Sequence, residues 1–346
     1  WIGRNNEGID DCTYWARYND TLDLDGARLS GAGSIIARPG DDSDTIYKRS
    51  VTYYSSPPTK TGSPKILIIG DSLTYRGTAS KLSAKLVAAG VTPTFLGTYK
   101  DAGGVWCEGR PSWEFSDFTR RHLVVNPDGS APTYPVDATG GDGVVTNVAQ
   151  YLALNSAPSD YAARWSYNPF IRPSVGGDNC AYVKNGYIFD MRFYLDRFSI
   201  ADPDIVMIAL GTNDVSSNPG HSGDPSGTAL GNCTEGLAIL YAQIWAALPS
   251  AKIAIVLNGF PQKYLWDAAV PFFKHVLQTY GGREGEGIFV LPVYMAMDTK
   301  SAYGIAVSST DALGTQKGIT SDWVHADAIG MSQWAEMTHA FVMNQI

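Results

Sequence analysis

One serine in this chain lies where a catalytic nucleophile could be presented. Ser72 follows a glycine and an aspartate at the end of the apolar run 66–69. Four consecutive branched aliphatic residues predict a strand buried on both faces, and the apolar spacing of 78–89 predicts a helix behind it. A serine on a sharp strand-to-helix turn is exposed at the end of a sheet, where hydrolases present their nucleophile. Because Gly-Asp-Ser is also ordinary turn chemistry, the assignment depends on residues elsewhere in the chain.

An aspartate and a histidine near the C-terminus could complete a hydrolytic site. Asp322 and His325 are three residues apart, so both side chains can face the same way on one turn of chain. A carboxylate that orients an imidazole, and an imidazole that reaches a serine, form the Ser-His-Asp arrangement of base, orienter and nucleophile. An apolar-periodic stretch follows at 328–342 and predicts a final helix.

Two further segments could place hydrogen-bond donors beside that serine. Asn213 lies in Gly-Thr-Asn-Asp directly after the second apolar run, 205–210. An asparagine at the C-terminal end of a parallel strand can donate its side-chain amide into a site there. Gly109 lies in Cys-Glu-Gly-Arg-Pro-Ser-Trp, and a glycine lets its backbone N–H approach a ligand closely.

These four blocks, in this order, resemble the SGNH (GDSL-type) hydrolase family, which is named for a serine, a glycine, an asparagine and a histidine in four separate segments. The match is Ser72 in Gly-Asp-Ser-Leu, Gly109 in Glu-Gly-Arg, Asn213 in Gly-Thr-Asn-Asp and His325 in Asp-x-x-His, and it covers about 64–346. The resemblance implies a flavodoxin-like three-layer α/β/α sandwich with a parallel sheet. The Gly-x-Ser-x-Gly elbow of α/β-hydrolases is absent, because no glycine follows two residues after the serine.

The resemblance also implies a mechanism that needs no metal or organic cofactor. Ser72 would attack an ester carbonyl, and His325 would take its proton and later give it to the leaving alcohol. Asp322 would hold the histidine in the required tautomer. The oxyanion hole would consist of the backbone N–H groups of Ser72 and Gly109 and the side-chain amide of Asn213.

Other titratable residues near these blocks, or on predicted helices, have structural interpretations. Asp71 and Asp214 lie beside turn residues, so we expect them to cap helices or to bond to loop backbone. His275 and His339 lie inside helical patterns at 268–280 and in the final helix. We therefore expect both histidines to be packing or surface residues.

Candidate substrate contacts lie around the second block and after the third. Trp106 and Trp113 lie on either side of the candidate hole glycine, and His221 lies in the loop after the asparagine and could line the pocket. Glu108 and Arg110 flank the same glycine and would form either a surface ion pair or a substrate contact.

The remaining pattern of the hydrolase region predicts alternating strands and helices. Segments 94–97, 252–257 and 287–293 are typical of strands, and 235–248 is typical of a helix between two of them. Strands that alternate with helices predict a parallel sheet with helices on both faces.

Residues 1–63 lie outside the resemblance. They alternate short apolar groups with Gly, Asp and Ser and end near the Pro57-Pro58 pair, which predicts a β-rich N-terminal region. It could be a small accessory domain, or part of a larger neighbour such as a surface or virus-tail adhesin. No signal peptide is recognised and the chain opens at Trp1, so we interpret it as a processed product or a piece of a longer protein.

The stretch 121–199 is too long for a simple connection between the second and third blocks. Exposed aromatic rings there would suit sugar rings, whose C–H faces stack on aromatic planes. The alternative is that the rings form the insertion's own core, because a small insertion must bury something to be ordered. The aromatic residues concerned are Tyr134, Tyr151, Tyr161, Trp165, Tyr167, Phe170, Tyr182, Tyr187, Phe189 and Tyr194.

Composition favours an extracellular or surface-displayed enzyme. Of 346 residues only 17% are charged, while Gly, Tyr and Trp are abundant. The net charge of −8 argues against nucleic acid or anionic membranes as partners, and no run reaches the ~18 apolar residues that span a bilayer. The four cysteines include no Cys-x-x-Cys pair, so no zinc site is expected, and they could form two disulfides or none.

Together these features predict a serine esterase that removes O-acetyl groups from a carbohydrate. One alternative is a short-chain carboxylester or lipid hydrolase, which would need long apolar loops near the site. A second is a glycan-binding module with a vestigial site, as in one domain of a larger surface protein. The sugar, the ester position and the oligomeric state are left open.

Overall fold

A computed structural model describes most of the chain, which divides into two compact units, Trp1–Pro58 and Thr59–Ile346. The described residues are 2–4, 14–16, 31–37, 47–53, 57, 59–119, 168–184, 186–216, 229–260, 263–297, 302–310, 316–320, 322 and 324–346.

The described elements of the smaller unit are all strands. β1 (Ile2–Arg4) pairs antiparallel with β2 (Tyr14–Ala16). β3 (Gly31–Ala37) pairs antiparallel with β4 (Tyr47–Tyr53) over the full length of both strands.

The larger unit is built on a seven-stranded sheet in the order β14-β13-β12-β5-β8-β7, with β6 paired to β5. Every pairing is parallel except that of β7 with β8. The strands β6, β5, β12, β13 and β14 follow the 2-1-3-4-5 order of flavodoxin-like folds, so the predicted fold class is confirmed. The strands are β5 (Lys65–Gly70), β6 (Thr94–Leu96), β7 (Tyr99–Lys100), β8 (Trp106–Gly109), β12 (Ile205–Ala209), β13 (Lys252–Val256) and β14 (Ile288–Leu291).

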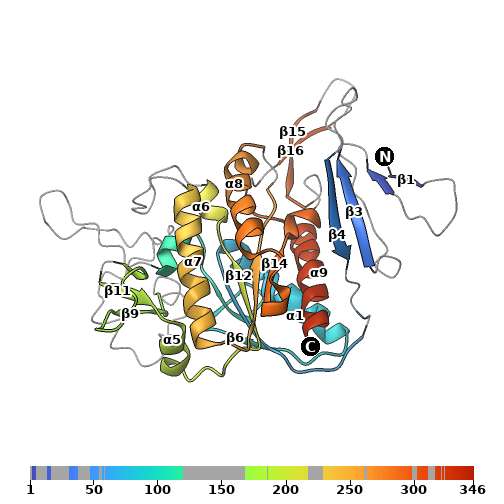
Figure 1. Ribbon diagram of the computed structural model, residues 1–346. Helices are drawn as coiled ribbons and strands as arrows, with labels where there is room; N and C mark the ends of the chain where they lie inside the picture. The colour runs from blue at the N-terminus through green and yellow to red at the C-terminus, as the bar shows by residue number, and fades with distance from the viewer. Residues whose placement is uncertain are drawn as a thin grey trace, which may run out of the picture. The chain divides into compact units, whose positions relative to one another are not determined.

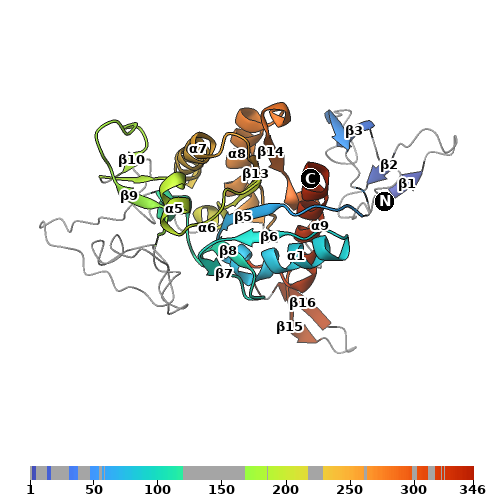
Figure 2. The same cartoon turned by 90° about the horizontal axis from the view of Figure 1, so that it is seen from below.

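Helices cover both faces of this sheet (Figure 1). Figure 2 shows α7 and α8 on one side of β5 and β6, and α1 on the other. The α9 helix packs with α1, because buried side chains of both belong to one hydrophobic cluster. The four helices are α1 (Ala79–Ala88), α7 (Ala229–Ala247), α8 (Lys263–Tyr280) and α9 (Ala328–Gln345), and each coincides with or contains most of a segment predicted as helical.

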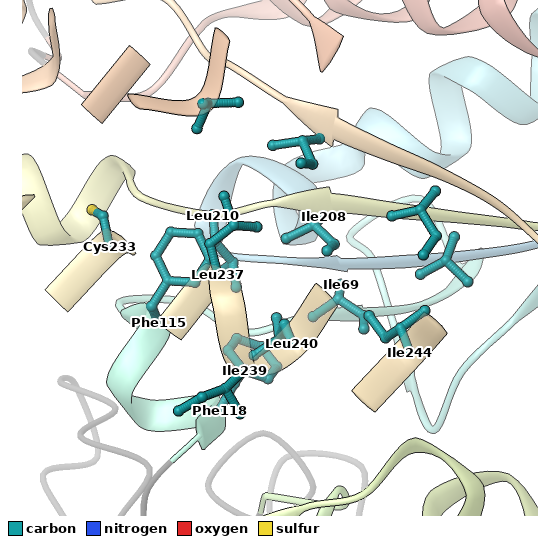
Figure 3. Packing of buried hydrophobic residues seen from close by; sticks show 14 of the residues in the cluster. Ile69, Phe115, Phe118, Ile208, Leu210, Cys233, Leu237, Ile239, Leu240 and Ile244 are labelled. Carbon is teal, nitrogen blue, oxygen red and sulfur yellow. The ribbon is translucent and has the colours of Figure 1, made fainter. Parts of the chain in front are cut away.

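The central strands are buried on both faces, as their unbroken apolar sequence predicts. In β5, Leu67 and Ile69 enter the cluster formed with α7 and α8, whereas Ile66 and Ile68 enter the one formed with α1 and α9. Figure 3 shows Ile69 in the same cluster as residues of α7. This alternation fixes the register of the strand, because a slip of one residue would exchange the two sets.

Part of the long insertion packs into the main core. A three-stranded antiparallel sheet, β10-β11-β9, precedes α5 (Met191–Arg197). Phe170, Phe189 and Tyr194 are fully buried, and the Phe170 ring stacks on the other two with centroids 4.8 and 4.2 Å apart. These rings are therefore buried rather than exposed to a sugar, but they lie in the main core and not in a core of the insertion's own. The strands are β9 (Ile171–Pro173), β10 (Val183–Lys184) and β11 (Tyr187–Phe189); Tyr134, Tyr151, Tyr161, Trp165 and Tyr167 lie outside the described residues.

The cysteines that the structure describes are free thiols: Cys107 and Cys233 are buried and Cys180 is exposed. The two-disulfide alternative is therefore wrong. Within the described ranges no helix has the length and apolar character to cross a bilayer. The other elements of the larger unit are η2 (Thr74–Thr78), α2 (Phe115–Thr119), α6 (Thr212–Ser216), η4 (Glu284–Glu286), η5 (Val293–Met295), β15 (Ile305–Thr310) and β16 (Gln316–Thr320).

Candidate active site

Three of the predicted site residues follow the carboxyl ends of three neighbouring strands. Ser72 follows β5, Gly109 ends β8 and Asn213 follows β12, and both β8 and β12 pair with β5. The strands β6 and β12 lie on opposite sides of β5, so the strand order reverses there. Ligands of open α/β sheets bind at such a switch point, outside the carboxyl ends of the strands.

A tight turn carries Ser72 from β5 into a helix. The Leu73 N–H donates to Oδ1 of Asp71 at 2.9 Å, and the Tyr75 N–H donates to the Asp71 carbonyl at 3.1 Å. The helix that follows is at first a π-helix, η2, which bends at Gly77 where φ is 118° before α1 begins. This differs from the plain strand-to-helix step that the sequence predicts. The serine keeps only 6% of its surface exposed, less than expected.

Ser72, His325 and Asp322 form a chain of two hydrogen-bonding contacts, with the histidine in the middle. Oγ of Ser72 is 2.8 Å from Nε2 of His325, and Nδ1 of the same ring is 2.9 Å from Oδ2 of Asp322. The other carboxylate oxygen accepts the backbone N–H groups of Val324 at 3.1 Å and of His325 at 2.9 Å. The carboxylate is thus held on both oxygens, as a group that orients an imidazole must be.

The start of α9 fixes the loop that carries the histidine. Asp327 caps this helix, because its Oδ1 accepts the N–H groups of Ile329 at 2.8 Å and Gly330 at 3.1 Å. The Asp327 N–H in turn donates to the carbonyl of Ala302 at 2.8 Å. The imidazole therefore projects from a short loop that is tied down immediately after it.

Charge and burial favour an ionised acid and a neutral base. Burial acts to raise the pKa of Asp322, but the N–H groups of His325 and Val324 outweigh it and lower that pKa below its usual value. Burial lowers the pKa of His325, and the positive charge of Arg76 lowers it further, against the opposing effect of Asp322. A neutral imidazole bonded to a serine hydroxyl is ready to accept its proton.

The two other candidate donors, Gly109 and Asn213, lie beside the serine turn. Gly109 is paired with Gly70 in register, and a Cβ on it would lie 2.6 Å from the backbone nitrogen of Tyr75. Its own N–H points to the weak acceptor Sγ of Cys107 at 3.4 Å. Nδ2 of Asn213 donates to the carbonyl of Trp113 at 2.9 Å, which holds the amide at this edge of the sheet.

The structure corrects one predicted substrate contact. Trp113 is fully buried, with its ring 4.7 Å from that of Phe118 in an edge-to-face arrangement, so its side chain has no surface with which to meet a substrate. Trp113 contributes its backbone carbonyl to the site, which accepts the hydrogen bond from the Asn213 amide. Trp106 is 38% exposed and lies under the ammonium group of Lys100, and His221 lies outside the described residues.

The residues on either side of Gly109 form neither a surface ion pair nor a substrate contact. Glu108 and Arg110 are both buried, with Oε2 and Nη2 2.5 Å apart. The second carboxylate oxygen accepts the hydroxyl of Tyr194 at 2.7 Å and the Thr98 N–H at 2.5 Å. Both predicted alternatives are therefore wrong, because α5 and the sheet enclose the pair.

The structural roles predicted for Asp71 and Asp214 are confirmed. Asp71 closes the serine turn, and burial raises its pKa to about 6. Asp214 accepts the Phe115 N–H at 3.3 Å and the Asn232 amide at 2.5 Å. Burial, followed by the nearby charge of Glu114, raises the pKa of Asp214 well above its usual range.

Sequence reasoning missed Arg76, whose Nη1 lies 3.3 Å from Oδ2 of Asp322. The available signal was its spacing: on a helix, residue 76 lies on the same side as Ser72, four positions earlier. Nothing in the sequence indicated that the Asp-x-x-His loop would come within reach of that side.

Two other features of the described residues bear on the position of the site. Among the described residues no cluster of three His, Cys, Asp or Glu side chains could hold a metal ion. A hollow of about 520 Å³ is lined by Lys65, Ile205 and Lys252. These residues begin β5, β12 and β13, so the hollow lies at the amino ends of the strands, opposite the serine.

Comparison with known proteins links this geometry to a family. Residues 66–337 match the model of the GDSL-like lipase/acylhydrolase family. A search of curated proteins found no significant relative.

Solved structures that this chain resembles include two carbohydrate esterases and a possible lipase. A family 3 carbohydrate esterase from Clostridium thermocellum is 15% identical with a TM-score of 0.44, and the match covers 82% of this chain and 98% of that one. A carbohydrate esterase family 3 protein from Talaromyces cellulolyticus is 16% identical with a TM-score of 0.41, covering 81% and 97%. A possible lipase from Chitinophaga pinensis is 13% identical with a TM-score of 0.41, covering 82% and 98%.

Proposed function

The chain belongs to the GDSL-like lipase/acylhydrolase family, and from that premise we propose that it is a serine esterase with Ser72 as nucleophile, His325 as general base and Asp322 as the residue that orients the base. The observation that carries the proposal is the continuous contact from Oγ of the serine to Nε2 of the histidine, 2.8 Å, and from Nδ1 to the carboxylate, 2.9 Å.

In the acylation step the serine oxygen attacks the ester carbonyl while its proton passes to Nε2 of His325. The imidazolium that forms is stabilised by Asp322, which accepts the Nδ1 proton in a hydrogen bond. When the tetrahedral intermediate collapses, Nε2 returns the proton to the departing alcohol and the acyl group stays on Ser72. In deacylation the same nitrogen takes a proton from water as the water oxygen attacks the acyl carbonyl. When this second tetrahedral intermediate collapses, the bond to the serine oxygen breaks, Nε2 returns the proton to that oxygen, and the carboxylic acid is released.

The oxyanion of both tetrahedral intermediates would be bound by the N–H groups of Ser72 and Gly109 and the amide of Asn213. Support comes from their placement after three adjacent strands at one edge of the sheet. The N–H of Gly109 donates to the sulfur of Cys107 at 3.4 Å, a weak acceptor that a negatively charged oxygen would outcompete. Loss of one such donor typically costs on the order of a hundredfold or more in turnover.

The proposed substrate is an O-acetyl group on a carbohydrate. Trp106 supports this, because it exposes an aromatic ring on the strand that ends at Gly109, and aromatic planes stack on the C–H faces of sugars. The low charged fraction of 17% is in keeping with a neutral substrate. The buried rings of the insertion add no support, since Phe170, Phe189 and Tyr194 have no exposed surface.

The test is acetate release from a panel of acetylated polysaccharides and from 4-nitrophenyl acetate, with wild-type protein beside Ser72→Ala. Ser250→Ala is the matched control, because that serine is exposed at the opposite end of the sheet. We expect turnover by wild type and by the control, and none by Ser72→Ala.

The substrates separate the finer alternatives. Release from a polysaccharide would support the carbohydrate deacetylase. Cleavage of 4-nitrophenyl acetate alone would support the short-chain carboxylesterase instead. Activity that persists in Ser72→Ala, or no activity on any ester, would contradict the proposed function; glycan binding without turnover would then support the binding module.

A further inference from the structure

One arginine connects the segment after the nucleophile to the acid of the triad. Arg76 lies on η2, four residues after Ser72, and its Nη1 is 3.3 Å from Oδ2 of Asp322. The two residues are 246 positions apart in the chain. The guanidinium is 48% exposed and the carboxylate 35%, so the pair lies at the surface of the site.

The oxygen that Arg76 contacts is the one nearest to the histidine ring. Oδ2 of Asp322 lies 2.9 Å from Nδ1 of His325, whereas Oδ1 also accepts the backbone N–H groups of Val324 and His325. The backbone donors therefore fix one oxygen within the loop. Arg76 fixes the other against rotation away from the imidazole, and it does so from the helix that follows the nucleophile.

Building on the serine esterase proposed above, we infer that Arg76 is a positioning residue, which holds Asp322 against His325 and keeps the imidazole in its neutral, proton-accepting form. An exposed ion pair contributes little to stability, typically 0–1 kcal/mol. A charge beside a titrating base has a larger effect on the pH range in which that base can accept a proton than on stability.

The charges that face His325 in the described structure are few. From η2 comes the positive charge of Arg76, and from its own loop the negative charge of Asp322; the serine hydroxyl facing Nε2 is neutral. Burial lowers the pKa of His325 most, Arg76 lowers it next, and Asp322 raises it. Without the arginine only burial would oppose the effect of the aspartate, so the pKa of His325 would rise and the base would be protonated at a higher pH.

The experiment compares Arg76→Gln, Arg76→Lys and wild type in 4-nitrophenyl acetate hydrolysis across pH. This substrate carries no ionisable group, so the acid limb of kcat/KM reports the enzyme. Arg192→Gln is the matched control, because it removes the same charge and breaks exposed ion pairs with Asp196 and Asp202. Thermal unfolding of each variant checks that it is folded.

We expect Arg76→Gln to move the acid limb to higher pH and to lower kcat above that limb by up to about fivefold, with KM unchanged. Arg76→Lys retains the charge, so its acid limb should lie close to that of wild type. In 1 M salt the acid limb of wild type should move towards that of Arg76→Gln. Arg192→Gln should match wild type. The inference would be overturned if the acid limb of Arg76→Gln coincided with those of wild type and Arg192→Gln. A rise in KM alone would also overturn it.

A second readout separates failure of this inference from failure of the proposed function. The ring of His325 can be titrated by NMR in wild type and in Arg76→Gln, with the signal assigned by its loss in His325→Ala, and this needs no turnover. A higher midpoint in Arg76→Gln would support the electrostatic role even if no ester were cleaved. An unchanged midpoint would contradict it even in an active enzyme.

Discussion

The phenolic hydroxyl of Tyr194 donates a 2.7 Å hydrogen bond to Oε1 of Glu108 in the interior of the protein. The same carboxylate accepts the Thr98 N–H and pairs with Arg110, so that both neighbours of Gly109 are held by buried polar contacts. Taking an ion pair out of water is costly, and apolar side chains of similar volume are often as stable. We therefore interpret the network as a means of fixing the end of β8, where a candidate oxyanion donor lies.

Replacing Tyr194 by phenylalanine should destabilise the protein by about 1.5–3 kcal/mol, because a buried carboxylate loses one of its donors. Tyr303→Phe is the matched control: Tyr303 is also buried, but its hydroxyl donates to the neutral carbonyl of Gly259 at 2.6 Å. Its loss should cost about 0.5–1.5 kcal/mol. Urea unfolding measures both, and equal losses would contradict a charged acceptor at Glu108.

The main elements of the hydrolase region could be predicted from sequence because their signals are local. Unbroken apolar runs such as 66–69 and 205–210 can only be satisfied between two layers of helices. The turn after each run is marked by glycine and polar residues, which sets the end of the strand and the place of Ser72 and Asn213. The three-residue spacing of Asp322 and His325 similarly predicts that the two side chains meet, and in the structure they do.

The environment of Gly109 could not be predicted in this way. Whether Glu108 and Arg110 lie at the surface depends on what covers them, and Tyr194, which contacts the carboxylate, is 86 residues away. Trp113 is buried for a related reason, since its ring packs on Phe118 in the same enclosed region. Such contacts depend on how the layers assemble, and no local pattern encodes that.

Asp322→Asn should lower kcat for 4-nitrophenyl acetate by about a hundredfold or more, while the fold is kept. The asparagine retains an oxygen for the Val324 and His325 N–H groups, but its amide nitrogen would donate to Nδ1 and favour the wrong tautomer of the base. Asp202→Asn, at an exposed ion pair with Arg192, should leave kcat unchanged. A wild-type rate in Asp322→Asn would remove this residue from the catalytic machinery and leave the serine and histidine in place.

Gly109→Ala should lower kcat by on the order of a hundredfold, because the added Cβ would lie 2.6 Å from the Tyr75 nitrogen and 2.9 Å from the Thr74 carbonyl carbon. Since these are backbone atoms, β8 or the serine turn must shift, and we also expect a loss of about 1–3 kcal/mol in stability. Gly176→Ala, where an added Cβ meets nothing within 4 Å, should be neutral. An active, stable Gly109→Ala protein would show that the close approach of the two segments is not required.

The buried carboxyl of Asp71 should make stability fall as pH rises. Burial raises its pKa from 3.8 to about 6, against the opposing hydrogen bond from the Leu73 N–H. Because the folded protein holds this proton more tightly than the unfolded chain, ionisation between pH 4 and 6 costs stability, by about 3 kcal/mol for a shift of this size.

Asp71→Asn tests this directly, because asparagine keeps an oxygen for the Leu73 N–H and cannot ionise. Its own packing cost does not depend on pH, so the difference in unfolding free energy between variant and wild type should change by about 3 kcal/mol in favour of the variant from pH 4 to 7. Asp178→Asn is the control, since Arg172 lowers the pKa of Asp178 to about 2. The stabilising effect of the Asp178 carboxylate is lost only as pH falls below 4. The difference in unfolding free energy between Asp178→Asn and wild type should therefore stay constant above pH 5. A constant difference for Asp71→Asn as well, measured by urea unfolding at each pH, would mean that the carboxyl ionises as freely in the core as in water.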